Sequence, residues 1–455
     1  MTRDTGLHSL FFRSLCLKYS RSFSLFLLAG SLLAGSAGSQ QPPAASVASH
    51  RAGELRFVAM VTRHGVRSPT GRIEQINQYS AQPWPQWNVP AGNLTAHGFE
   101  LMRIMGAYYR QMYSAQGLLQ KRGCSDAEQI RIVADSDQRT RETGRALALG
   151  LAPECNLTVS ALAEGTPDPL FHSLEAGVGN PDRELAATAL AGRIGGDPEG
   201  LTAAYRTQLT ALEKVLEECP QTAVCNAQKP HSLFEISGAL APGKSDHIAD
   251  LRSPLGLAST ITENFLLEYS EGMDAAQVGW GRVNLETLRG LLQLHVAQED
   301  LTGRTSAIAR PQASNLLHHL LQSIDQAADG KWVAGALSKA SDRMLILSGH
   351  DTNQANIAGA LQLNWIVDGR RDDTPPGGAL VFELWKMPGA GGWEVRTYYV
   401  AQTLDQMRHA TPLTLETPPQ RVPVFIPGCG QTDGFCSLSG FKKTVEAAVD
   451  MNFVR

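Results

Sequence analysis

The sequence has few charged residues and no excess of positive charge. Charged side chains make up only 18% of its 455 residues, and 40 Lys and Arg stand against 44 Asp and Glu. Proteins that bind nucleic acids or anionic membrane surfaces generally carry a basic surface. We therefore expect no nucleic-acid partner, and any anionic ligand has to be bound by a local cluster of cations.

The N-terminal apolar stretch is too short for a membrane anchor. Residues 22–34 form an apolar run of thirteen residues, whereas a spanning helix needs about 20. Basic residues precede this run and small residues follow it, which is the pattern of a secretory signal peptide. We predict that residues 1–39 are a signal peptide, and that the mature protein is periplasmic or secreted with no membrane segment.

The cysteines lack the spacing of a metal site. The sequence contains no CxxC pair, the usual mark of structural zinc, so we expect no metal. Cys16 is lost with the signal peptide, and the six remaining cysteines are an even number, which favours disulfides in an exported chain. Two short spacings and one remaining pair predict the bonds Cys219–Cys225, Cys429–Cys436 and Cys124–Cys155.

Three short apolar runs each lead directly into a polar cluster. The runs are residues 57–61, 129–134 and 344–347, and helical periodicity follows each of them further along the chain. Thr95 and Asp137 are placed to cap the first two helices. Recurring strands and helices predict an α/β sheet whose polar clusters meet at the carboxyl ends of the strands.

The pattern changes in the middle of the chain. Residues 182–302 show long helical periodicities, and the α/β pattern then returns. Residues 379–385 and 394–401 flank a glycine-rich connection, as two antiparallel strands would. We predict a discontinuous α/β domain formed by residues 54–181 and 303–445, with residues 182–302 inserted as a helical domain.

The predicted strand ends carry side chains that can bind an anion and provide a nucleophile. These side chains are Arg63, His64, Arg67, Arg139, His350 and Asp351. Guanidinium groups match phosphate oxygens, and a histidine among them can attack phosphorus. Nearby arginines should keep this imidazole neutral, while Asp351 could stay protonated in mild acid and donate to the leaving oxygen. Each residue alone is more often structural, and their joint placement favours the chemical interpretation.

Two motifs resemble those of a known family. Residues 63–70 (RHGVRSPT) resemble the RHGxRxP signature of the histidine acid phosphatases, and residues 349–353 (GHDTN) resemble their second signature. The similarity is strongest to the branch of bacterial periplasmic phytases and glucose-1-phosphatases, and it covers most of residues 54–445.

This resemblance implies a phosphoglycerate-mutase-like fold, in which a mixed-sheet α/β domain carries an inserted helical domain. It also implies hydrolysis of phosphomonoesters without metal or cofactor: His64 becomes a phosphohistidine, and Asp351 protonates the leaving alcohol. The residues implied in substrate binding are Arg63, Arg67, Thr70, Asp135, Arg139, Glu263, His295 and His350.

Two positions depart from the phytase pattern. Gly71 stands where those enzymes have a lysine, with Arg72 next to it, and Gln312 stands where they have an arginine, with Arg310 nearby. Because four other positions, Thr70, Asp135, Glu263 and His295, fit that pattern, we predict a monomeric, exported acid phosphatase acting on phytate. A glucose-1-phosphatase or broad sugar-phosphate phosphatase is the alternative. A phosphomutase would be a shorter, cytosolic chain, and a non-catalytic phosphate-binding protein would not need both His64 and Asp351.

Overall fold

The predicted signal peptide, including Cys16, lies outside the part of the chain that can be described. A computed structural model describes residues 53–389 and 392–455. Everything below concerns these residues, which belong to one compact unit.

A mixed sheet forms the centre of the α/β part. Its strand order is β11-β10-β9-β1-β6-β2-β3, with β12 paired to β10. The strands are β1 (Glu54–Arg63), β2 (Ile130–Ala134), β3 (Val159–Ser160), β6 (Met344–Gly349), β9 (Ala379–Lys386), β10 (Trp393–Ala401), β11 (Gln420–Pro423) and β12 (Cys436–Ser437). β1, β6, β2 and β3 run parallel, whereas β9, β10 and β11 pair antiparallel. The predicted α/β fold with a mixed sheet is confirmed.

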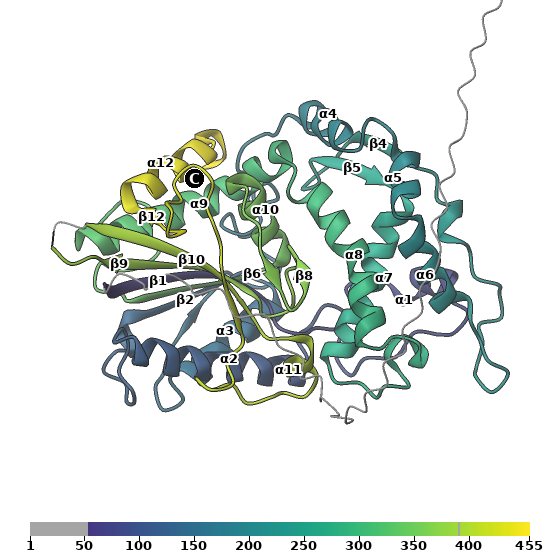
Figure 1. Cartoon of the computed structure of the whole chain (residues 1–455), viewed down its shortest axis with the longest axis horizontal. Coiled ribbons are helices and arrows are strands. Elements are labelled where there is room, and N and C mark those ends of the chain that lie inside the picture. Colours follow the sequence, from purple (N-terminus) through teal and green to yellow (C-terminus); the bar gives the residue numbers. More distant parts are fainter. Residues whose placement is uncertain (1–52, 390–391) are drawn as a thin grey trace, which may run out of the picture. The chain divides into compact units, whose positions relative to one another are not determined.

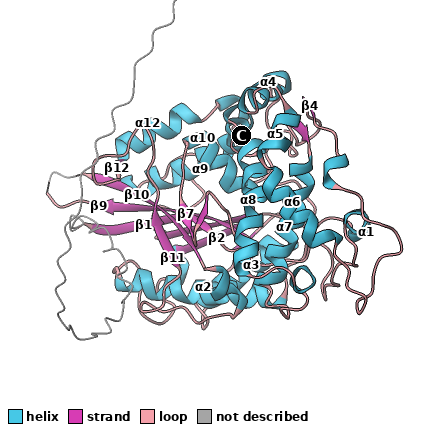
Figure 2. Cartoon of the chain, turned by 45° about the vertical axis from the view of Figure 1, so that its right-hand side comes forward, coloured by secondary structure: helices cyan, strands magenta, loops and turns pink. Residues whose placement is uncertain are grey.

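Helices cover both faces of this sheet (Figures 1 and 2). They are α2 (Ala96–Ala115) and α3 (Gln138–Leu151) on one face, and α9 (Ser306–Asp329), α10 (Asp351–Leu361) and α12 (Leu438–Ala448) on the other. Successive side chains of β1 enter opposite cores: Val58 and Met60 pack with α2 and α3, while Phe57, Ala59 and Val61 pack with α9 and α10. A strand buried on both faces reads as a continuous apolar run, which is why residues 57–61 were recognisable.

The predicted helical insertion is mostly, but not entirely, helical. Its elements are α4 (Arg183–Arg193), α5 (Pro198–Ala204), α6 (Arg206–Glu217), β4 (Ala239–Pro242), β5 (Ala249–Arg252), α7 (Pro254–Ser270) and α8 (Leu285–Thr302). The hairpin β4–β5 was not predicted. Pro242 cannot continue a helix, and a Cβ on Gly243 would lie 2.2 Å from the carbonyl oxygen of His247, so the chain turns here. The domain boundaries at residues 182 and 302 stay a prediction.

The remaining elements are short: α1 (Ile73–Ile76), β7 (Ile366–Val367), β8 (Arg370–Arg371) and α11 (Leu404–Arg408). Strands β7 and β8 pair with each other as a small separate sheet.

The two predicted helix caps differ from each other. The Thr95 side chain accepts a hydrogen bond from the backbone of Gly98 at 2.8 Å and caps α2, as the sequence suggested. Asp137 occupies the cap position of α3, but its side chain makes no capping bond. Its carboxylate lies 2.6 Å from a guanidinium nitrogen of Arg139 instead. The Asp137 carboxylate therefore pairs with the charged side chain of Arg139 and not with a backbone N–H of α3.

Three disulfides join the cysteine pairs suggested by the sequence: Cys124–Cys155, Cys219–Cys225 and Cys429–Cys436.

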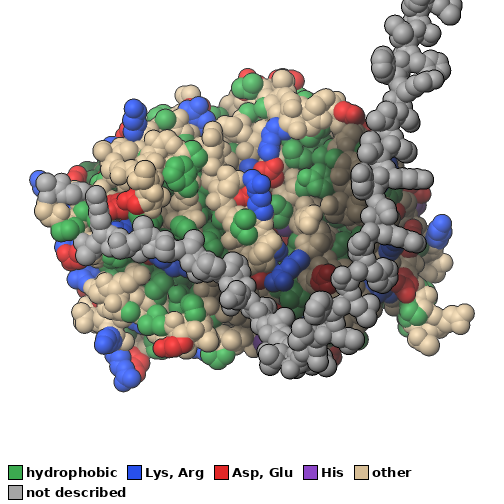
Figure 3. All heavy atoms as spheres, viewed as in Figure 1, with side chains coloured by type: hydrophobic (Ala, Val, Ile, Leu, Met, Phe, Trp, Pro, Cys, Tyr) green, Lys and Arg blue, Asp and Glu red, His purple; other side chains and the backbone are tan. Residues whose placement is uncertain are grey.

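Basic and acidic side chains are interspersed on the face of the molecule drawn in Figure 3. Among the described helices, none combines the length and apolar character needed to cross a membrane.

Candidate active site

The loop after β1 is held tightly against α2. A Cβ on Gly98 would lie 2.1 Å from the carbonyl oxygen of Val66, and a Cβ on Gly65 would lie 2.9 Å from the carbonyl oxygen of Gly98. The two glycines therefore allow a backbone approach that no larger residue permits. This contact fixes the direction in which the side chain of His64 leaves the end of β1.

His64 is buried and neutral. Its Nδ1 lies 2.8 Å from the carbonyl oxygen of Gly65, so Nδ1 carries the proton and donates it there. The pKa of His64 lies well below its usual range, because burial and the positive charges of Arg63, Arg139 and Arg67 all oppose an imidazolium. The Nε2 lone pair is therefore available to an electrophile even in mild acid.

One carboxylate holds two of the arginines. Arg63 is fully buried, donates to the carbonyl oxygen of Thr374 at 2.7 Å, and is ion-paired with Glu263. Arg67 lies 3.0 Å from the same Glu263 oxygen. The two guanidinium groups therefore share one oxygen of Glu263, which holds them side by side.

The surroundings of Asp351 favour its ionised form, and its expected role as proton donor in mild acid stays a prediction. Its carboxylate lies 2.8 Å from a guanidinium nitrogen of Arg63. Burial alone would raise the pKa of Asp351, but the charges of Arg63 and Arg67 outweigh it and hold the pKa well below the usual range. A phosphate dianion bound to Arg63 would cancel this effect and raise the pKa, so protonation of Asp351 depends on bound substrate.

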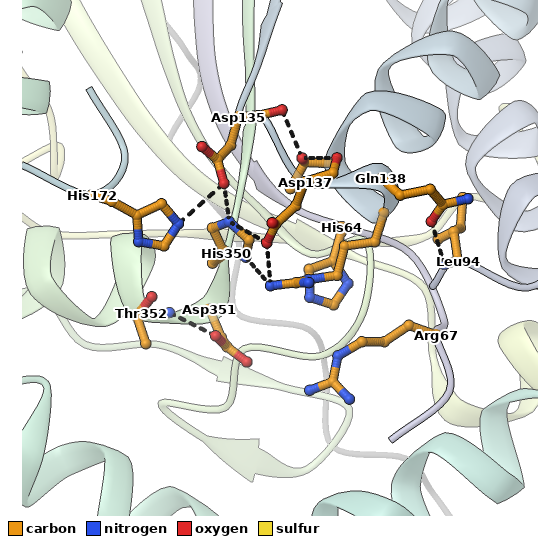
Figure 4. A network of polar contacts seen from close by, with 12 residues as sticks. His64, Arg67, Leu94, Asp135, Asp137, Gln138, His172, His350, Asp351 and Thr352 are labelled. Atoms are coloured by element: carbon orange, nitrogen blue, oxygen red, sulfur yellow. Dashed lines mark hydrogen bonds and ion pairs between the residues drawn. The ribbon is translucent and has the colours of Figure 1, made fainter. Parts of the chain in front are cut away.

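Asp135 accepts hydrogen bonds from two histidines through one oxygen atom. Its Oδ2 lies 2.7 Å from Nε2 of His350 and 3.0 Å from Nε2 of His172, and Figure 4 shows both rings pointing at this carboxylate. Nδ1 of His350 faces a guanidinium nitrogen of Arg139 at 3.3 Å. Both Nε2 atoms are therefore donors, and Nδ1 of His350 is an acceptor. The pKa of His350 is lowered, since burial and Arg139 outweigh Asp135.

The same region contains four side chains whose ligand atoms lie within 4.8 Å of one another: Asp135, Asp137, His172 and His350. Their number and type would suit a transition metal. Arg139 already occupies the carboxylate of Asp137 and faces Nδ1 of His350, so the group acts here as a hydrogen-bonded network. The expectation of a metal-free site stays a prediction.

A pocket of about 720 Å³ opens at these strand ends. Predicted site residues that line it are His64, Arg67, Thr70, Arg139, His350 and Asp351. Others lie behind them: Arg63 and Asp135 are fully buried, and Glu263 contacts the arginines. His295 is also buried, with its Nδ1 3.0 Å from the hydroxyl of Ser259. Glu263 and His295 are therefore placed to position other side chains and not to contact the substrate directly.

The two neighbouring arginines do not replace the cations missing at positions 71 and 312. Gln312 lines the pocket, but Arg310 donates to the carbonyl oxygen of Val449 at 3.2 Å. Neither Arg310 nor Arg72 is among the described residues that line the pocket. Gly71 has no atom within 4 Å of a Cβ built on it, so a larger side chain would fit there.

Sequence reasoning missed six ionisable residues of the pocket, and His172 and Glu299 are the two most relevant to its charge; the others are Glu175, Asp246, His247 and Asp250. His172 lies in a turn after Pro169, and Glu299 lies near the end of α8, so neither follows a strand. Neither residue could be found by searching the ends of the predicted strands. A histidine separated from every motif carries no local signal in one sequence.

A neutral buried histidine among arginines, at the carboxyl ends of parallel strands, defines a site for transfer of a phosphoryl group. The family model of the histidine phosphatase superfamily (branch 2) matches residues 54–403, and the chain belongs to this family.

Curated relatives and solved structures agree with this assignment. The chain is 40% identical to phytase AppA of Escherichia coli and 28% identical to the glucose-1-phosphatase of Salmonella typhimurium, in each case over 87% of this chain and 92% of the relative. The structure of Hafnia alvei phytase in complex with myo-inositol hexakis sulphate superposes with a TM-score of 0.80 at 34% identity, over 88% of this chain and 98% of that one.

Proposed function

We propose that this protein is an exported phosphatase that hydrolyses phytate through a phosphohistidine formed on His64. The observation that carries the proposal is the neutral His64, whose Nε2 is free while Arg63, Arg67 and Arg139 surround it. A phosphomonoester bound to these arginines would present its phosphorus to Nε2.

The reaction has two steps. Nε2 of His64 attacks phosphorus and the ester P–O bond breaks, while Asp351, protonated once the substrate's charge occupies Arg63, gives its proton to the leaving oxygen. Water then attacks the phosphohistidine, Asp351 takes a proton from that water, and phosphate and neutral His64 are regenerated. Arg63, Arg67 and Arg139 bind the phosphoryl oxygens in both steps. His350 would join them only with a proton on Nδ1, because its Nε2 already donates to Asp135.

Phytate is favoured as substrate by the similarity to phytases. A second candidate, hydrolysis of glucose 1-phosphate or another sugar phosphate, is favoured by Gly71 and Gln312, which leave fewer cations for additional phosphates. The glucose-1-phosphatase of Salmonella typhimurium is a more distant relative, at 28% identity.

A single assay separates these alternatives. Purified protein is offered phytate, glucose 1-phosphate and p-nitrophenyl phosphate, with His64→Ala as the inactive control. We expect turnover of all three by the wild type and the highest kcat/KM for phytate. A higher value for glucose 1-phosphate would favour the second candidate, and no turnover of any substrate would indicate a non-catalytic phosphate-binding protein.

A further inference from the structure

The pocket has few cations beyond the central arginines. The described residues that line it include no lysine, and those able to carry positive charge are Arg67, Arg139, His64, His172, His247 and His350. The carboxylates that line it are Glu175, Asp246, Asp250, Glu299 and Asp351. A substrate with several phosphates would therefore meet a mostly acidic outer wall.

Only two of the pocket histidines can supply positive charge to that wall. His64 and His350 both have lowered pKa values and stay neutral. The side chain of His247 is 75% exposed and 4.0 Å from Asp246, so solvent screens its charge. The side chain of His172 is 31% exposed and anchored to the buried Asp135 at 3.0 Å. His172 is therefore the ordered outer group best placed to carry a charge.

His172 lies next to the reaction centre without being part of it. The ring centroids of His64 and His350 are 5.7 Å apart, and those of His350 and His172 are 4.9 Å apart. Figure 4 shows His350 between the other two rings. A phosphate held at His172 would thus be a neighbour of the phosphate attacked by His64.

We propose that His172, as an imidazolium, binds a second, non-scissile phosphate, so that the protein selects polyphosphorylated substrates in acid. This inference rests on the proposed function and deepens it. Asp135 fixes Nε2 of the ring, and the remaining edge of the ring is left to the substrate. His172 is then a specificity-determining residue.

The charged surroundings of His172 set the sign of the pH dependence. The groups around it are Asp135, Asp137, Asp168, Glu175 and His350. Burial opposes protonation, but the carboxylates outweigh it and raise the pKa above the ordinary 6.5. His172 therefore carries its charge in acid and loses it as the pH rises past its raised pKa. Burial also raises the pKa of Glu299 to about 7, so repulsion of anions grows over the same range.

The test is a titration of binding with a ligand whose own charge is constant. Myo-inositol hexakis sulphate stays fully ionised, so its Kd, measured by calorimetry between about pH 5 and about pH 8, reports the charge of the protein. For the wild type we expect binding to weaken by about tenfold or more as the pH rises, the effect of one charge-assisted contact.

Two substitutions distinguish charge from positioning. His172→Gln keeps an N–H donor for Asp135 without a charge. This variant should bind about tenfold more weakly than the wild type in acid, and the difference should shrink as the pH rises. His172→Lys keeps a charge that does not titrate in this range, and should keep tight binding at about pH 8. The matched control is His231→Gln, since His231 also pairs with a carboxylate, Glu235 at 3.3 Å, but lies outside the pocket.

Equal Kd profiles for the wild type and His172→Gln would overturn the inference. So would a loss of binding in both variants, since that would assign His172 a structural role through Asp135. Binding is measured without turnover, so these results are independent of the assay that tests the proposed function. If the protein bound the sulphate tightly and with this pH dependence but hydrolysed no phosphomonoester, the proposed function would be contradicted and the role of His172 would stand.

Discussion

Asp351 and the phosphate of the substrate compete for the positive charge of Arg63. The ion pair of 2.8 Å between Asp351 and Arg63 favours the ionised carboxylate. A phosphate dianion that binds Arg63 removes this stabilisation, and the general acid is then protonated only where it is needed. The acid is thus coupled to occupancy of the phosphate site.

This coupling predicts a leaving-group effect for Asp351→Asn. We expect kcat for phytate to fall by about 100-fold or more, because an alcohol leaves poorly without a proton. The loss for p-nitrophenyl phosphate should be smaller, since its phenolate needs little protonation. Steady-state kinetics on both substrates, with circular dichroism as the folding control, measures this. Equal losses on both substrates would argue against a general acid at this position.

Gly71 provides a second prediction for a single residue. The space around it is open, and Gly71→Lys would add a cation near Thr70 at the pocket wall. We expect kcat/KM for phytate to rise roughly tenfold, with little change for p-nitrophenyl phosphate. Gly71→Ala is the control, since it adds a side chain without charge. If the lysine variant behaved like the alanine variant, other groups would already bind that phosphate.

Residues within motifs could be placed from the sequence, and residues outside them could not. Arg63, His64 and His350 follow buried strands, so their meeting at one sheet edge was predictable. His172 reaches Asp135 from a turn distant in the chain, and only tertiary packing brings it there. The ion pair between Asp351 and Arg63, which favours the ionised carboxylate, could not be predicted, because a sequence does not show it.

At the scale of elements, α2 supports the catalytic loop through Gly98. The contact of this glycine with Val66 leaves no room for a methyl group. The need for such close approach has no signal in one sequence, although the helix and its Thr95 cap were predictable.

Gly98→Ala should therefore lower the free energy of unfolding by about 1–3 kcal/mol through overpacking, and should lower kcat by moving His64. The matched control is Gly290→Ala in α8, where no atom lies within 4 Å of the added Cβ. That change should stabilise the protein by about 0.4–1 kcal/mol. Urea unfolding of both variants measures the difference. A fully stable and active Gly98→Ala would show that the loop is not held by this contact.

At the scale of the whole molecule, the disulfides should contribute unequally to stability. Cys124 and Cys155 close a loop of separation 31, whereas the other two pairs have separations of 6 and 7. In the chain-entropy picture, removing the long-range pair should cost about 3.7 kcal/mol, and removing either short pair less. Double serine variants and urea unfolding test the order, and non-reducing peptide mapping tests the pairing. Free thiols in the native mature protein would contradict the assignment.

The disulfide pairing could be predicted from the short spacings of two of the cysteine pairs. The mixed sheet could be predicted from its buried apolar strands. The hairpin β4–β5 was not, since Ala and Leu at residues 239–241 are equally common in helices, and pairing between distant segments decides the outcome.

A covalent bond between phosphorus and His64 is the central step of the proposed reaction. Rapid alkaline quenching during turnover of p-nitrophenyl phosphate, followed by mass spectrometry of the peptide that contains His64, tests for it directly. We predict phosphate on His64 in the wild type, and neither phosphopeptide nor turnover in His64→Ala, which should keep the wild-type circular dichroism. Turnover without phosphorylation of His64, or phosphate on His350 instead, would contradict the account.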